Sequence, residues 1–131
     1  MTIAMASSFY VERVDDLSVL CFSVRSLTEQ NYEIVAEELL EFVTLVSMDD
    51  HIRVVAELSR VESIDDLGLA MLRAFSDSIR DAGGRLILCS VRSEVVAAIR
   101  QSEMDCEVSR TCGDAMTTFS NSANFKGWSR C

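Results

Sequence analysis

Hydrophobic residues gather along the chain in short runs that predict five strands. Two runs rich in β-branched and aromatic residues are joined only by Asp15 and Asp16, and this tight acidic turn predicts an antiparallel hairpin. The run Val54-Val55-Ala56 is apolar on both faces, which suits a strand that is covered on both sides. The predicted strands are residues 9–14, 17–24, 52–58, 85–91 and 106–109.

Helical spacing of apolar residues fills the intervals between these strands. The first helix has two competing N-cap residues, Ser26 and Thr28. Its Glu33, Glu37 and Glu41 lie opposite the apolar stripe and should be exposed to solvent. The apolar stripe of the second helix is Leu67, Ala70, Met71, Ala74, Phe75, Ser78, Ile79 and Ala82, and the helix is ended by Gly83-Gly84. A third helix is capped by Ser93, with Val96 and Ile99 as core contacts, and a fourth opens at Gly113 or Asp114 and runs through Phe119.

The predicted order β-β-α-β-α-β-α-β-α defines an α/β fold, a small mixed β-sheet with helices packed on it. Strands that are separated by helices of this length pair in parallel through right-handed crossovers. Residues 9–119 form the predicted domain, between a flexible N-terminal tail of residues 1–8 and a C-terminal tail of residues 120–131. In the second tail, Phe125 and Trp128 either anchor a partner or pack on the chain's own surface, and the sequence leaves both open.

Composition and charge narrow the range of functions. The chain has 131 residues, of which 49% are hydrophobic, and this fits one domain with a buried core. A formal net charge of -9 argues against nucleic acid and anionic membranes as partners. No run approaches the roughly 20 apolar residues of a membrane span, and the N-terminus lacks the basic segment of a secretory signal. We therefore expect a cytoplasmic protein whose five cysteines are reduced.

Residue patterns that would indicate catalysis or metal binding are sparse. The lone histidine, His51, follows Asp49-Asp50 in a predicted turn, and the spacing places no nucleophile or third partner beside it. Metal ligands at suitable spacing are missing. Gly83-Gly84 follows a helix and precedes a strand, which is the reverse of a phosphate-binding loop. The sequence therefore predicts no enzymatic activity, no cofactor and no metal site.

The most informative segment is the loop Ile64-Asp65-Asp66-Leu67-Gly68-Leu69, which runs into the second helix. That helix ends at Ala82-Gly83-Gly84, the strand Arg85-Leu86-Ile87-Leu88 follows, and Ser93-Glu94-Val95 stands where the next helix begins. In the order and spacing of these short motifs, the chain resembles the STAS family of anti-sigma factor antagonists. The resemblance covers about residues 9–119.

This resemblance implies a protein-binding function in transcriptional regulation. Antagonists of the family bind an anti-sigma factor that is also a serine kinase, and phosphorylation of a hydroxyl at the start of this helix releases the complex. The implied partner is therefore an anti-sigma factor of the serine-kinase type. Of the motif residues, Asp65 and Gly68 match the family. We expect the surface around them to bind the partner, and the candidate partner-binding residues are Ser63, Asp65, Asp66, Leu67, Gly68 and Leu69.

The chain departs from the family at the phosphoacceptor. Asp66 and Leu67 replace the two hydroxyl residues, and Ser63 lies before the matching position, so the motif holds no phosphoacceptor. Asp66 has three interpretations: a partial mimic of phosphoserine, the mark of a scaffold that binds without switching, or an ordinary acidic helix start worth about 0.3–1 kcal/mol. The alternative function is a constitutive STAS scaffold, or a homo-oligomer, without a phosphorylation switch.

Two further residues of the motif have two interpretations each. Gly68 would cost a helix about 1 kcal/mol relative to alanine, so it either lets the helix pack closely on a strand or keeps the surface flat for a partner backbone. Leu67 supplies apolar contact to a partner, together with Leu69, or belongs to the core stripe of the helix.

Overall fold

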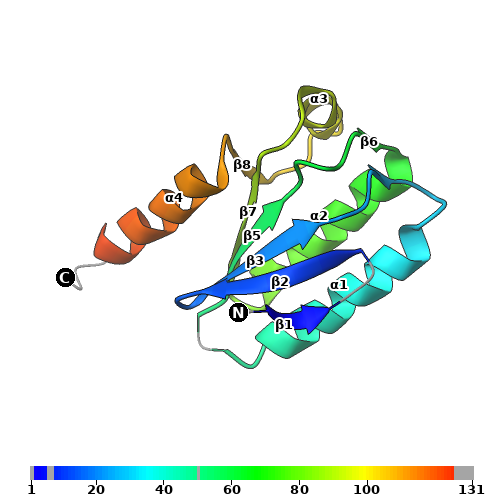
Figure 1. Cartoon of the computed structure of the whole chain (residues 1–131). Helices are drawn as coiled ribbons and strands as arrows, with labels where there is room; N and C mark the ends of the chain where they lie inside the picture. The colour runs from blue at the N-terminus through cyan, green and yellow to red at the C-terminus, as the bar shows by residue number, and fades with distance from the viewer. Residues whose placement is uncertain (1, 6–7, 50, 126–131) are drawn as a thin grey trace.

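Over residues 2–5, 8–49 and 51–125, which the computed structural model describes, the chain forms a six-stranded sheet in the order β1-β2-β3-β5-β7-β8 and a separate two-stranded pair, β4-β6 (Figure 1). The strands are β1 Thr2–Met5, β2 Phe9–Val14, β3 Leu17–Phe22, β4 Ser26–Leu27, β5 Arg53–Glu57, β6 Ser63–Ile64, β7 Arg85–Cys89 and β8 Glu107–Ser109. The helices are α1 Tyr32–Val46, α2 Asp66–Asp81, α3 Ser93–Gln101 and α4 Cys112–Phe125.

The sheet is mixed, as the sequence predicts. Strands β2 and β3 form the expected antiparallel hairpin, with Val14 opposite Leu17 across the turn. Asp15 takes a left-handed conformation there, with φ 57°, which aspartate tolerates better than most residues. Strands β3, β5, β7 and β8 run parallel to one another. The α/β fold class is confirmed.

Alternate residues of the central strands point to opposite faces of the sheet. In β5, Val54 and Ala56 belong to the main core under α1 and α2, whereas Val55 belongs to a second core under α4. All three side chains are fully buried, which confirms the prediction of a strand covered on both faces. Figure 1 shows α1 and α2 side by side on one face of the sheet and α4 on the other.

Helix α1 begins later than either predicted cap. Ser26 lies in β4, and the N-cap of α1 is Asn31, whose side chain folds the loop before the helix. Asn31 Oδ1 accepts a hydrogen bond from Thr28 N at 3.1 Å, and Asn31 Nδ2 donates to Ser26 O at 2.8 Å. This short-range competition between side chain and backbone delays the helix to Tyr32. The three outward glutamates are exposed, as predicted.

The buried stripe of α2 differs from the predicted one. Leu67, Ala70, Ala74 and Ala82 are exposed. The buried residues of the helix are Gly68, Met71, Leu72, Phe75, Ser76 and Ile79. Glycine and serine are small enough to approach the sheet, so they take positions that a hydrophobic pattern does not reveal. The predicted stop is confirmed, because Gly83 has φ +85° and its N–H donates to Arg80 O at 2.9 Å.

The ends of the chain also differ from the sequence prediction. Thr2–Met5, within the predicted flexible tail, forms β1 and pairs antiparallel with β2. Backbone pairing needs no hydrophobic period, so a pattern of side chains does not show it. Helix α4 continues beyond Phe119 to Phe125, while Trp128 and the Phe125 side chain lie outside the described residues. In α3 the core contact is Val95 rather than Val96.

Candidate functional site

The predicted partner-binding residues lie at the edge of the sheet where parallel strands end. Strand β4 pairs in parallel with β6, Ser26 opposite Ser63 and Leu27 opposite Ile64, and α2 begins immediately after β6. Helix α1 begins at the same edge, because it follows β3 as α2 follows β5 (Figure 1). The short β4-β6 pair thus connects the starts of both helices.

Asp65 is the N-cap of α2 and holds two segments together. Its Oδ1 accepts a hydrogen bond from Gly68 N at 2.9 Å, and its Oδ2 accepts one from Glu29 N at 3.0 Å, in the loop before α1. Its own N–H donates to Leu27 O at 3.1 Å. The hydrogen bond from Gly68 and then that from Glu29 hold the pKa of Asp65 below that of an ordinary aspartate, since both favour the ionised carboxylate.

Gly68 is buried where α2 crosses the β4-β6 pair. A Cβ at this position would lie 2.1 Å from Leu27 O and 2.7 Å from Ile64 Cγ1, which is far inside van der Waals contact. The structure therefore supports the first interpretation of this glycine, close packing of the helix on a strand. No larger residue fits without moving the backbone of β4.

The remaining residues of the motif divide between the core and the surface. Leu69 is half-buried against the main core. Ser63 and Asp66 are exposed, and Leu67 is 41% exposed, outside both cores. Asp65 and Gly68 fix the turn, and it presents Asp66 and Leu67 outward. The prediction that Leu67 lies in the core stripe is wrong for this reason.

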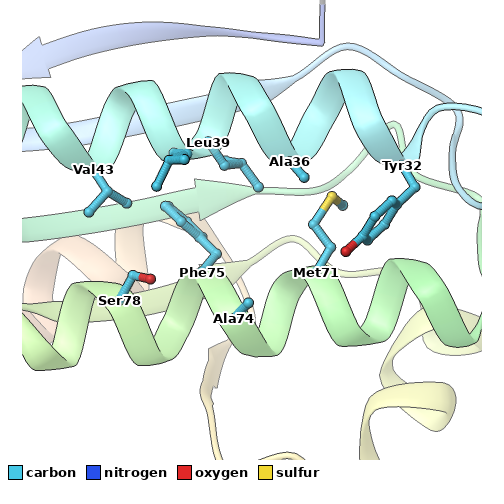
Figure 2. A pocket seen from close by; sticks show the side chains of 9 residues that line it. Tyr32, Ala36, Leu39, Val43, Met71, Ala74, Phe75 and Ser78 are labelled. Carbon is cyan, nitrogen blue, oxygen red and sulfur yellow. The ribbon is translucent and has the colours of Figure 1, made fainter.

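An apolar groove, which the hydrophobic pattern of the sequence does not predict, runs between α1 and α2 beside this turn (Figure 2). It holds a cavity of about 190 Å³, and we call it the α1–α2 groove. Tyr32, the first residue of α1, and Met71, in the second turn of α2, face each other at one end of it. Leu40, on α1, is 64% exposed where it lines the groove. The lining residues are Tyr32, Ala36, Leu39, Leu40, Val43, Met71, Ala74, Phe75 and Ser78.

Further candidates for catalysis or metal binding in the described part of the chain are the lone histidine and the residue types that bind metals. His51 is exposed in the turn that precedes β5, as predicted. Among the residues that the structure describes, no three or more His, Cys, Asp and Glu residues come together in a way that could hold a metal ion. No helix within those residues is long and apolar enough to cross a membrane.

Strands and helices alternate along the chain, and helices cover both faces of the mixed sheet. The chain is therefore a small α/β domain. The family model of the STAS domain matches residues 15–124, and the chain belongs to this family. The match covers most of the segment that carries the sequence resemblance, which is thereby confirmed. Among curated proteins, none matches the chain.

Solved structures share this fold. An anti-sigma-factor antagonist (STAS) domain protein from Planctomyces limnophilus is 20% identical, with a TM-score of 0.76 over 86% of this chain and 97% of that one. A variant of RsbS from Moorella thermoacetica is also 20% identical, with a TM-score of 0.71 over 90% and 99%. A chain of the stressosome, a signal integration and transduction hub, is 19% identical, with a TM-score of 0.64 over 86% and 97%. At these identities the likeness concerns the fold.

Proposed function

We propose that this STAS domain is a non-enzymatic, cytoplasmic regulator of transcription that binds an anti-sigma factor of the serine-kinase type. The contact surface is the first turn of α2, with Asp66 and Leu67 at its centre and Ser63 at its rim. The observation that carries the proposal is the outward position of Asp66 and Leu67 on a turn that Asp65 and Gly68 hold in place. Such preorganisation reduces the ordering cost of binding.

The α1–α2 groove extends this surface. A side chain of the partner that enters the groove would bury apolar area next to Leu67, and buried apolar anchors dominate the energy of most interfaces. The acidic turn and the net charge of -9 favour a partner surface with basic residues, which would speed the encounter at low salt. In this proposal, charge complementarity favours the encounter with a basic partner surface, and burial of apolar area supplies most of the binding free energy.

The bound state that we propose is not switched by phosphorylation at this turn. Neither Asp66 nor Leu67 offers a hydroxyl, so a kinase partner has no acceptor at the start of α2. The single charge of Asp66 is smaller than that of a phosphoserine, and its carboxylate has fewer acceptor oxygens. Asp66 is therefore compatible with a bound partner, whereas a phosphoserine at the same position would cost more free energy to desolvate in the interface.

A capture experiment from a lysate of the native cells tests the proposal, with the wild type and Asp66→Ser as baits. Recovery of an ATPase-type anti-sigma factor by the wild type supports it and excludes phosphoserine mimicry. Addition of ATP and Mg²⁺ should then leave the wild-type complex intact. Recovery by Asp66→Ser alone would mean that the native chain is held in the released state. Recovery by neither bait would contradict the proposal.

A second candidate function is a constitutive scaffold or homo-oligomer. Two observations favour it: the fold likeness to a stressosome chain, and apolar residues exposed on α1. Ile34, Leu40 and Leu45 are 56%, 64% and 63% exposed. A solution mass of several chains by light scattering, together with no captured kinase, would favour this function over the first.

A further inference from the structure

Two cysteines that are 23 positions apart in the sequence meet beneath α4. Cys89 is the last residue of β7, and Cys112 is the first residue of α4. Their Sγ atoms lie 2.6 Å apart. A disulfide bond is about 2.04 Å long, so the two sulfurs need to move by only about 0.6 Å to bond. Both residues are free thiols in this structure.

The fold holds both residues in these positions. Strand alternation places Cys89 on the face of the sheet that α4 covers, in the second core with Val55 and Ile87. The start of α4 is fixed by Thr111, whose Oγ1 accepts a hydrogen bond from Asp114 N at 3.1 Å. Farther along the helix, Ala115 and Phe119 are buried in the same core. The approach of the two thiols therefore follows from the packing of α4 on the sheet.

We propose that Cys89 and Cys112 form a reversible intramolecular disulfide when the protein meets a peroxide. The pair lies on the face opposite to the α1–α2 groove, and the inference does not depend on the proposed function. Sequence alone shows no CxxC spacing, and it predicts five reduced thiols. A reversible disulfide agrees with a reducing compartment in which oxidation is transient.

The reaction proceeds in two balanced steps. Cys112 is half-buried and accessible, so its sulfur attacks a peroxide oxygen; an S–O bond forms, the O–O bond breaks, and water leaves. Cys89 Sγ then attacks the sulfenic acid on Cys112; an S–S bond forms, the S–O bond breaks, and the hydroxide leaves as water with the proton of Cys89. Two thiols and one hydrogen peroxide thus give one disulfide and two waters.

The order of these steps follows from the surroundings of the two thiols. Cys89 is fully buried, and burial is the main cause that raises the pKa of its thiol above that of an ordinary cysteine. A thiol with a raised pKa reacts slowly with an oxidant in solution. Cys89 therefore acts second, on a sulfenic acid that is already beside it.

The other described cysteines are less suited to pair with Cys89. Cys21 also lies on the α4 face, but Glu57 of β5 stands between them, paired with Cys21 on one side and Cys89 on the other. Two strand spacings amount to about 9–10 Å, beyond the roughly 7 Å that the Cα atoms of a disulfide allow. Cys106 packs against the main core, on the other face of the sheet.

Trypsin separates all five cysteines, so peptide mapping tests the pairing directly. Cys89 falls in the peptide of residues 86–92 and Cys112 in that of residues 111–126. The reduced full-length protein is treated with hydrogen peroxide, free thiols are blocked with N-ethylmaleimide, and the digest is analysed without reductant. We expect a linked species of these two peptides that disappears with dithiothreitol. Cys112→Ser and Cys89→Ala should abolish it, and Cys21→Ser and Cys106→Ser should retain it.

A second measurement keeps the test valid if a variant is less stable. The disulfide closes the loop that contains α3 and β8, so oxidised wild type should melt several degrees above the reduced protein. Cys112→Ser, which should fold like the reduced wild type, should show no such shift. Two results would overturn the proposal, both with the peptide of residues 86–92 left unlinked. In the first, peroxide oxidises Cys112 to sulfinic acid, and in the second it links Cys112 to the peptide of residues 14–25 or to Cys131.

Discussion

At the scale of single residues, Gly68 ties the sequence motif to the packing of the site. Its missing side chain lets α2 cross β4 at a distance that a methyl group would not allow. We expect Gly68→Ala to lower the free energy of unfolding by about 1–3 kcal/mol, because the backbone of Leu27 has to shift. Denaturant titration measures this.

Gly113→Ala is the matched control for that substitution. A Cβ at Gly113 would lie 3.7 Å from Thr111 Oγ1, which is an ordinary contact, and alanine favours the helix. This variant should be as stable as the wild type or slightly more stable. Equal stability of the alanine variants at positions 68 and 113 would contradict the packing that we describe.

Asp65 should make the stability of the site depend on pH. Its pKa is lowered in the folded protein by the hydrogen bond from Gly68 and then that from Glu29, so the ionised form stabilises the fold above the ordinary carboxyl pKa of about 3.9. That contribution is lost as the pH falls through the lowered folded-state pKa. Thermal melts should show Asp65→Ala several degrees below wild type at pH 7, with a narrower gap near pH 2.

Asp66→Ala is the control for this pH dependence, because the exposed Asp66 caps no backbone group in the described structure. It should reduce the melting temperature less than Asp65→Ala. A gap between Asp65→Ala and wild type that stays constant from pH 7 to pH 2 would disprove the capping role.

The sequence shows part of this site and hides the rest. The sequence motif predicts a loop that runs into the second helix, and the structure contains it, but the role of Asp65 as the N-cap of α2 was not predicted. The contact of Gly68 with Leu27 depends on the pairing of β4 with β6. Two-residue strands whose paired residues lie 37 positions apart have no period to detect, so only the folded chain reveals why the glycine is required.

At the scale of elements, α4 covers the second face of the sheet with few anchors. Phe119 is 5% exposed, and the Arg85 guanidinium lies 5.5 Å from its ring centroid. Phe119→Ala should cost about 3–5 kcal/mol and loosen α4 before the rest of the fold. Labelling with a thiol reagent under native conditions should then modify Cys89 and Cys112 faster than in the wild type.

Phe75→Ala is the matched control, because it removes a ring of the same size from the main core. It should destabilise the whole domain without selective labelling beneath α4. If both variants label Cys89 and Cys112 to the same extent relative to Cys106, α4 does not open as a separate unit.

Elements with a strong hydrophobic period are the ones that the sequence locates correctly. The runs around Val54 and Leu86 are strands because helices cover both of their faces. The start of α1 is misplaced because Asn31 bonds the preceding loop, a local effect that competes with the cap of Ser26 or Thr28. β1 is missed because it depends on backbone pairing with β2.

At the scale of the whole molecule, two separate regions of the domain carry the two proposals. The acidic turn and the α1–α2 groove lie where α1 and α2 begin, and in the function that we propose they form the contact surface for the partner. The opposite face carries α4 and the thiol pair. Family membership was readable from the order of the motifs, whereas the groove was not, since it forms only when two helices pack side by side.

The central claim is that the first turn of α2 contacts the partner, and Leu67 and Val108 test it as a pair. Both are apolar and 41% exposed, but Val108 lies on β8 and not in the first turn of α2. The measurement is the Kd of the captured anti-sigma factor for Leu67→Arg and Val108→Arg, each checked for an unchanged melting temperature. We expect Leu67→Arg to weaken binding at least about tenfold, or 1.4 kcal/mol, and Val108→Arg to bind like the wild type. Wild-type affinity of Leu67→Arg, or a loss confined to Val108→Arg, would contradict the account.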